Sequence, residues 1–116
     1  MYNYKAKVLR VIDGDTIDIL IDLGWKIQIK DRIRFLGVDT PETRTRDKEE
    51  KKRGLEAKKY VIDKIEGKEI EIHTEKAGKF GRYLATVYYL EGKKKINLNK
   101  ELVKKGLGKE YFGGKR

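Results

Sequence analysis

Hydrophobic and polar residues alternate along the first third of the chain. In residues 16–23 every odd-numbered position is aliphatic and its neighbours are polar, with Leu20 as the one exception. A period of two is typical of a β-strand with one buried face. Residues 5–13 are rich in β-branched side chains, and residues 27–38, after a turn signal at 22–24, alternate again. The pattern therefore predicts three consecutive antiparallel strands that form a meander.

The period changes to that of a helix after Gly54. Apolar side chains at positions 57, 60, 61 and 65 follow a spacing of i, i+3, i+4 and i+8, which defines one face of a helix that ends at Gly67. Residues 43–53 contain no apolar side chain. A segment of this kind cannot bury surface, so we interpret it as a mobile loop that precedes the helix.

The second half of the chain returns to strands and ends in a helix. Residues 69–74 alternate again, and residues 82–90 form an aromatic-rich segment after a glycine-bracketed turn. Asn97 is a plausible N-cap for a last helix that stops at Gly106. The final segment, 111–116, is glycine-rich and polar, and we expect it to be frayed.

This element order, β-β-β-α-β-β-α, is that of the five-stranded OB barrel. The predicted fold class is mainly β with α (α+β), with one helix between strands 3 and 4 and one C-terminal helix. A chain of 116 residues has room for one domain, so residues 1–116 are expected to form a single unit.

Composition narrows the chemistry that this barrel can perform. The chain has 29 basic and 19 acidic residues, hence a net charge of +10, which favours a polyanionic partner. It contains no cysteine, no serine and one histidine, His73, which is expected to face solvent on its strand. Serine hydrolase triads, Cys–His dyads and the usual His/Cys zinc sites are therefore excluded. Any chemistry must come from carboxylates, arginines, lysines, tyrosines and a hard cation.

Hydropathy also bears on location. No run of 18 apolar residues is present, and Met1 leads directly into polar residues without the apolar region of a signal peptide. We therefore expect a cytoplasmic protein without membrane contact. Enrichment in lysine and glutamate, with few thermolabile residues, is typical of a heat-adapted proteome.

Two clusters of carboxylates stand at strand ends. Asp13 and Asp15 lie between the first two strands, while Asp39 and Glu42 follow the third. In a meander these places fall at the same edge of the sheet, so the carboxylates can meet there. Ligation by oxygen alone favours Ca²⁺ or Mg²⁺. The alternative is that the first cluster is only a turn and the second only a strand terminator.

Two arginines stand out in a chain where lysine is the commoner cation. Arg34 is embedded among apolar residues near the end of the third strand, and Arg82 follows a glycine at the start of the fifth. Both can present a bidentate fork to a phosphate, which lysine cannot do. The alternative is that each is a solvated strand residue or part of a rim ion pair.

Four sequence motifs occur in an order that resembles a known family. They are VIDGDTI at residues 11–17, RFLGVDTPE at 34–42, GLEA at 54–57 and KFGR at 79–82. Together they resemble the thermonuclease family, typified by staphylococcal nuclease. The similarity extends over about residues 5–110, which is nearly the whole chain.

The resemblance implies a role for each matched position. In the family one Ca²⁺ is bound by two aspartates and a backbone carbonyl, which correspond to Asp15, Asp39 and Thr40. The residues that hold the turn and the ligand carboxylate in place correspond to Asp13 and Thr16. The glutamate that orients the attacking water corresponds to Glu42, and the arginines that clasp the phosphate to Arg34 and Arg82. Nucleotide contacts correspond to Lys79 and to Phe80, where the family usually has tyrosine.

The function implied is that of a calcium-dependent endonuclease acting on DNA and RNA, with single strands preferred. It would cut with little sequence specificity, leave 3′-phosphate ends and act as a monomer. An alternative is an OB-fold module that binds nucleic acid without cutting it, because fold alone does not separate the two. A basic ribosome- or chromatin-associated protein would explain the charge but leave the carboxylates unexplained.

Overall fold

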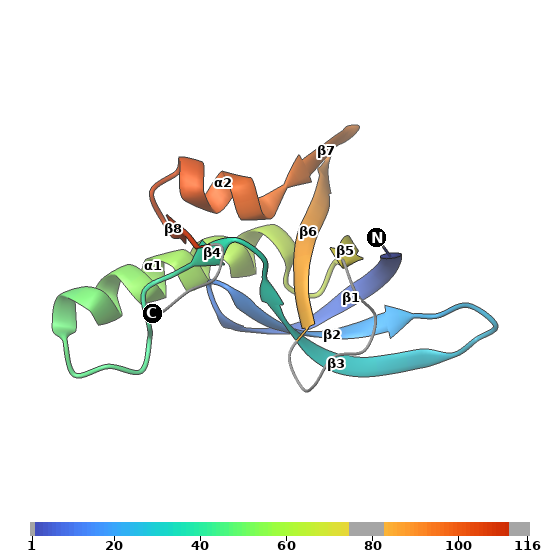
Figure 1. The fold of residues 1–116 in the computed structure, drawn as a ribbon, viewed down its shortest axis with the longest axis horizontal. Helices are drawn as coiled ribbons and strands as arrows, with labels where there is room; N and C mark the ends of the chain where they lie inside the picture. Colours follow the sequence, from blue (N-terminus) through green and yellow to red (C-terminus); the bar gives the residue numbers. More distant parts are fainter. Residues whose placement is uncertain (1, 75–82, 112–116) are drawn as a thin grey trace.

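Five strands close into a barrel in the computed structural model of the chain, which describes residues 2–74 and 83–111. The strands follow one another around the sheet in the order β3, β2, β1, β5 and β6, and each neighbouring pair is antiparallel. A parallel pairing between β3 and β6 closes the ring (Figure 1). The bounds are β1 Tyr2–Asp13, β2 Thr16–Asp22, β3 Gln28–Phe35, β5 Glu69–Thr74 and β6 Tyr83–Glu91. The predicted meander, α+β class and five-stranded barrel are confirmed.

Two short strands were not predicted: β7 (Lys94–Asn97), which forms a hairpin with β6, and β8 (Lys109–Glu110). The third predicted strand was expected to continue through Val38, but β3 ends at Phe35 and Val38 falls in a separate strand, β4 (Val38–Asp39), which pairs with β8 in a two-stranded sheet. Strands of two to four residues show no readable period, which is why the pattern did not reveal them. Tyr111, which we assigned to the frayed tail, donates its backbone N–H to Gly37 at 3.0 Å. The rest of that predicted tail lies outside the described residues.

The two helices are α1 (Lys48–Ile65) and α2 (Leu98–Lys104). The loop predicted over 43–53 is wrong from residue 48 onward, because α1 begins there. The Asp47 carboxylate caps the helix by accepting from the backbone N–H groups of Glu49 and Glu50 at 3.0 and 3.3 Å. This cap and the acidic first turn stabilise a helix start that carries no apolar period. The predicted N-cap of α2, Asn97, is confirmed, since its side chain accepts from the backbone of Lys100.

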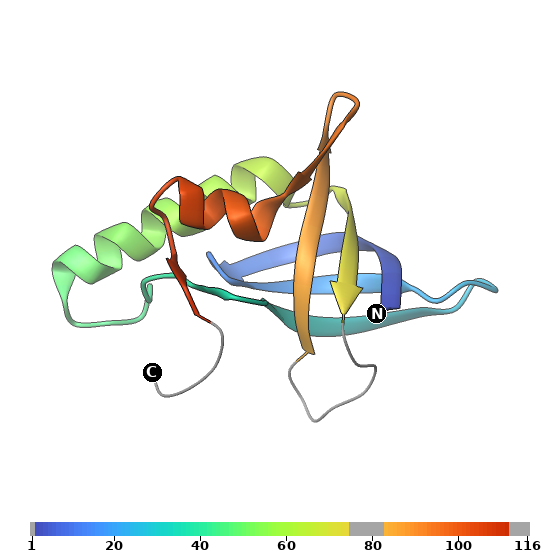
Figure 2. The ribbon, with the colours of Figure 1, turned by 45° about the horizontal axis from the view of Figure 1, so that its top comes forward.

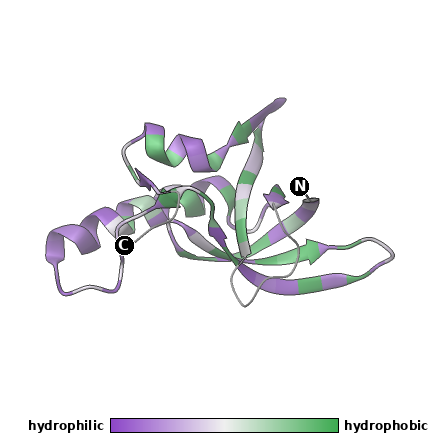
Figure 3. Cartoon of the chain, viewed as in Figure 1, coloured by the Kyte–Doolittle hydropathy of each residue, from purple (hydrophilic) through white to green (hydrophobic). Residues whose placement is uncertain are grey.

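The core lies inside the barrel and under the two helices. Its fully buried side chains include Ile17, Ile33 and Phe35 from the strands, Val61 from α1 and Leu102 from α2. Figure 3 shows the outer end of α1 as a hydrophilic segment, whereas hydrophobic residues alternate with polar ones along the strands. Neither of the two described helices is long and apolar enough to cross a membrane.

The β2–β3 hairpin, residues 20–30, projects as an arm away from both helices (Figures 1 and 2), and only its first residues, 20–22, still pair with β1 of the barrel. At its tip Trp25 and Lys26 have φ angles of 52° and 63°, in the left-handed region that non-glycine residues rarely adopt. The N–H of Ile27 donates to Gly24 O at 2.8 Å and closes the turn. Trp25 is 96% exposed, so the arm presents an indole to solvent.

One buried amide joins α2 to the barrel. Asn99 is 4% exposed, and its side-chain N–H groups donate to the carbonyl oxygens of Leu36 and Ala85 at 2.8 and 3.0 Å. Its side-chain oxygen accepts from the N–H of Val87 at 2.9 Å. This single side chain therefore satisfies three backbone groups where β3, β6 and α2 meet.

Replacing Asn99 by leucine should destabilise the protein strongly. The substitution removes the Asn99 hydrogen bonds to Leu36 O, Ala85 O and Val87 N–H, and of these groups Ala85 O still accepts from the N–H of Leu36 at 2.8 Å. We expect a loss of about 3 kcal/mol in the free energy of unfolding, measured by urea denaturation. Lys100→Ala, at the next and exposed position of the same helix, is the control and should change it by less than about 0.5 kcal/mol. Equal stability of the two variants would show that the amide contributes nothing.

Candidate functional site

The predicted site residues converge on one open cleft. The cleft has a volume of about 560 Å³ and lies where the β1–β2 turn, the outer face of β3 and the segment after β4 meet. Seven of the ten residues predicted to form the site line it: Asp13, Asp15, Thr16, Arg34, Asp39, Thr40 and Glu42. The other three, Lys79, Phe80 and Arg82, lie outside the described residues. Residues that are 29 positions apart in the sequence thus share one surface.

The Asp15 carboxylate stands at the centre of this cleft and is only 6% exposed. Its Oδ1 accepts from the Thr16 hydroxyl at 3.1 Å, and its Oδ2 accepts from the backbone N–H of Thr40 at 3.2 Å. Arg34 Nη2 lies 3.5 Å from the same Oδ2. One carboxylate therefore connects the β1–β2 turn, β3 and the segment after β4.

Strand register explains why Asp15 meets Arg34. Thr16 pairs with Arg34 across β2 and β3, and the N–H of Phe35 donates to Asp15 O at 2.9 Å. The Arg34 side chain, 19% exposed, therefore emerges beside the turn that carries Asp15. The meander predicted that the carboxylates after the first and third strands lie at one edge of the sheet, and Asp13, Asp15, Asp39 and Glu42 do line this one cleft.

A second hydrogen bond fixes the rim of the cleft. The Thr43 hydroxyl donates to Asp13 Oδ1 at 2.6 Å, which holds the chain after β4 against the end of β1. Between these fixed points Glu42 is exposed at the edge of the cleft. Its carboxylate is thus open to solvent while the backbone on both sides of it is restrained.

Close backbone packing restrains that segment further. A Cβ added to Gly54 of α1 would lie 2.6 Å from Glu42 O and 2.7 Å from Pro41 O, distances that real Cβ atoms do not adopt. A Cβ on Gly14 would lie 2.8 Å from the Ala57 methyl and 3.0 Å from Thr40 Cγ2. The segment that carries Thr40 and Glu42 therefore fits only because both neighbours lack a side chain.

Three arginines of the cleft were missed by the sequence analysis: Arg10, Arg32 and Arg44. Arg32 Nε and Nη2 contact the Asp18 carboxylate at 2.7 and 3.2 Å, and this hydrogen bonding lowers the pKa of Asp18. The signal that could have identified Arg32 is parity, because it lies two residues from Arg34 and so on the same face of β3. Arg10 could not be identified in the same way, because its placement depends on the strand irregularity between Val8 and Arg10, which the hydrophobic pattern of the sequence does not show.

The types of metal-ligating atom in the cleft are those that a hard cation prefers. Asp15, Asp39 and the Thr40 carbonyl are oxygen donors on one surface, and no histidine lines it. The buried Thr40 hydroxyl has no hydrogen-bond partner among the described residues. Within those same residues, no three acidic or imidazole side chains are grouped closely enough to hold a metal by themselves. A bound cation would therefore need a backbone carbonyl and water molecules beside the carboxylates.

His73 lies away from the cleft, on β5. The prediction that it faces solvent is wrong, because its side chain is only 17% exposed. Its Nε2 lies 2.5 Å from Glu71 Oε2, and its ring lies 4.4 Å from the ring of Tyr88. The His73 side chain is thus partly covered by Glu71 and Tyr88 on the barrel surface.

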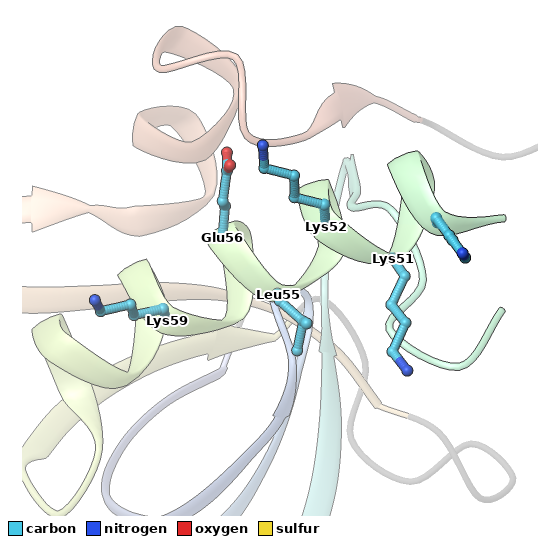
Figure 4. A pocket seen from close by; sticks show the side chains of 6 residues that line it. Lys51, Lys52, Leu55, Glu56 and Lys59 are labelled. Atoms are coloured by element: carbon cyan, nitrogen blue, oxygen red, sulfur yellow. The ribbon is translucent and has the colours of Figure 1, made fainter. Parts of the chain in front are cut away.

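A second hollow, of about 440 Å³, lies along the outer face of α1 (Figure 4). It is lined by one helix alone: Lys48, Lys51, Lys52, Leu55, Glu56 and Lys59. Apart from Glu56 the lining is basic and aliphatic, and no acidic pair or oxygen cluster faces it. The carboxylates predicted to form the site line the cleft around Asp15 and not this surface.

Comparison with known proteins gives a consistent result. A family model described as staphylococcal nuclease homologue matches residues 32–116. A thermonuclease of Staphylococcus hyicus is 36% identical over 91% of this chain and 59% of its own length. An endonuclease of Bacillus subtilis is 33% identical over 89% of this chain and 46% of its own length. A protein of Methanocaldococcus jannaschii is 32% identical over 95% of this chain and 60% of its own length. The chain thus spans about half to three fifths of these relatives.

The close packing at the cleft predicts a specific coupling between two positions. Gly14→Ala places a methyl group against the Ala57 methyl and should lower the free energy of unfolding by about 1–3 kcal/mol. The double variant Gly14→Ala/Ala57→Gly removes that clash, so its loss should be smaller than the sum of the two single losses by at least about 0.5 kcal/mol. Urea denaturation of the four proteins gives the coupling. Strict additivity would show that the two positions do not press on each other.

Proposed function

Because the chain belongs to the staphylococcal nuclease family, we propose that its cleft hydrolyses phosphodiester bonds of DNA and RNA. The observation that supports this most directly is the contact between Asp15 and Arg34 inside a cleft lined by four arginines. Arginine forks bind phosphate oxygens bidentately. Backbone phosphates and sugars carry no sequence code, so we expect little sequence specificity.

Arg34 is placed to act on the phosphate. Its side chain is largely buried, and only one nitrogen is engaged by Asp15, at 3.5 Å. Within the described residues its remaining N–H groups make no other hydrogen bond, so they can donate to the equatorial oxygens of a phosphate as negative charge grows on them. A donor held in place before the reaction stabilises that charge without a cost of reorganisation. Arg82 is proposed as its counterpart.

Glu42 is proposed to orient the attacking water. Its carboxylate is exposed at the edge of the cleft, while its backbone is fixed by Gly54 and by the Thr43–Asp13 hydrogen bond. A carboxylate so placed accepts a hydrogen bond from water and directs its lone pair toward phosphorus. In-line attack with departure of the 5′-oxygen would leave a 3′-phosphate end.

Calcium is the proposed cofactor, held by Asp15, Asp39 and the Thr40 carbonyl. Bound there, it would act as a Lewis acid on a phosphate oxygen. Thr16 and Asp13 would keep the ligand turn in position through their hydrogen bonds to Asp15 and Thr43. Lys79 and Phe80 are proposed to contact the nucleotide.

The alternative, a module that binds nucleic acid without cutting it, is disfavoured by the charges in the cleft. Four carboxylates, Asp13, Asp15, Asp39 and Glu42, line a surface that must receive a polyanion. Each of them repels phosphate, so a surface built for affinity alone is better without them. Their presence is explained if they hold a cation and position water.

Removal of the proposed catalytic groups should reduce the rate more than the affinity. Arg34→Ala and Glu42→Gln are each expected to lower kcat on single-stranded DNA about 10²–10³-fold. Binding depends on many basic side chains and should change by less than about fivefold. Arg53→Ala and Glu56→Gln, which are exposed on α1, are the matched controls and should cut like the wild type. Tight binding by the wild type without any fragments would establish the binding module instead.

Metal dependence gives a separate prediction. With single-stranded DNA as substrate, cleavage should be fast in Ca²⁺, much slower in Mg²⁺ and absent in EGTA, because a shell of two carboxylates, a carbonyl and water suits the larger ion. Asp15→Asn should raise the Ca²⁺ concentration needed for half-maximal rate at least tenfold. Full activity in EGTA would remove the metal from the mechanism.

A further inference from the structure

The hairpin arm and the part of the barrel face between it and Arg34 are not used by the proposed reaction. The outward positions of β1 and β3 form rows across β2. Arg10 and Arg32 both flank Asp18, and Lys7 and Lys30 both flank Leu20. In each of these two successive rows, therefore, β1 and β3 each place a cation beside the β2 residue.

This surface is continuous with the cleft. Arg34, Arg32 and Arg10 already line the cleft, and Lys30 and Lys7 follow one row further from it. The Arg32 hydrogen bond, with the charges of Lys30 and Arg10, lowers the pKa of Asp18, so these cations act on one site. One carboxylate among them leaves the surface net positive. We call Arg10, Lys7, Arg34, Arg32 and Lys30 together the basic track.

The arm extends the track to an aromatic tip. Lys30 lies four positions before Arg34, or roughly 14 Å along an antiparallel strand, and Lys26 lies four positions further still. Beside it, Trp25 is 96% exposed and has a left-handed backbone with φ of 52°. Positive φ at both central residues is what a two-residue hairpin turn requires, and the side chain that this turn holds in water at position 25 is an indole.

We propose that a single-stranded nucleic acid extends from the cleft along the basic track, and that Trp25 stacks on one of its bases. This inference rests on the proposed function, because it names the path of the same substrate. The lysines supply phosphate contacts and the indole supplies a face that any base can use, a combination suited to binding without sequence preference. The length of the track agrees with the four or more nucleotides that OB barrels cover.

Trp25 is the sole tryptophan of the chain, so its fluorescence reports the arm tip alone. Titration of the whole protein with a twelve-residue oligothymidylate in EGTA should quench this fluorescence. By anisotropy of the labelled oligonucleotide, Trp25→Ala should raise the Kd at least about fivefold, whereas Trp25→Phe keeps a stacking face and should stay within about twofold. The exposure of Trp25 predicts unchanged melting temperatures for both variants.

The contribution of Lys7 and Lys30 can be measured separately, from the salt dependence of binding. Lys7→Gln/Lys30→Gln should reduce the slope of log Kd against log salt by about 1.4, which corresponds to two lost phosphate contacts on a single strand. The control Lys93→Gln/Lys94→Gln removes the same charge from exposed positions of the β6–β7 hairpin and should leave slope and cleavage rate unchanged. An equal reduction of the slope in both double variants would overturn the track.

The outcomes separate the inference from the proposed function. Cleavage without quenching of Trp25, and with wild-type affinity in Trp25→Ala, would overturn the path and leave the nuclease intact. Quenching and a reduced slope without cleavage in Ca²⁺ would support the path and overturn the nuclease. Leu23, Ile27 and Ile29 of the arm are 42–54% exposed. A fluorescence change with protein concentration alone, accompanied by dimer formation in light scattering, would assign the arm to a second copy and overturn the inference.

Discussion

The position of the segment from Val38 to Glu42 depends on how closely it packs against three glycines. Added Cβ atoms at Gly54, Gly14 and Gly108 would lie 2.6 Å from Glu42 O, 3.0 Å from Thr40 Cγ2 and 2.8 Å from Val38 Cγ1. Interiors are packed too densely to absorb such overlaps without movement. The helix, the first turn and the chain before β8 thus fix one short segment from three sides, and the cleft owes its shape to that fit.

The charge arrangement follows from the same geometry. Because the Thr40 backbone is held against the β1–β2 turn, its N–H reaches the buried Asp15 carboxylate, which Arg34 approaches from β3. A buried carboxylate is stable only with such partners. Asp15 is therefore both a structural connection between three strands and the centre of the proposed chemistry. The outer faces of β1 and β3 carry basic side chains, which extend from Asp15 toward the hairpin arm.

The sequence was sufficient for the barrel and for the grouping of the site, but not for the segments without period. Alternation predicted the long strands, and the meander predicted that Asp15 and Asp39 share one edge. The start of α1 at Lys48 was missed because a cap at Asp47, rather than an apolar stripe, stabilises it. Short strands such as β8 and the glycine contacts depend on tertiary packing, to which no local pattern corresponds. The cleft residue Arg10 was hidden by the strand irregularity next to it.

Backbone packing positions the reacting groups, and the cleavage rate of Gly54→Ala is the sharpest test of this dependence. Cleavage of single-stranded DNA in Ca²⁺ should be compared with that of Lys51→Ala, an exposed change on the same helix, at a temperature well below both melting midpoints. Displacement of the Glu42 backbone by a fraction of an ångström to 1 Å should lower kcat of Gly54→Ala about 10²-fold with little change in affinity. Equal rates for the two variants would contradict the account.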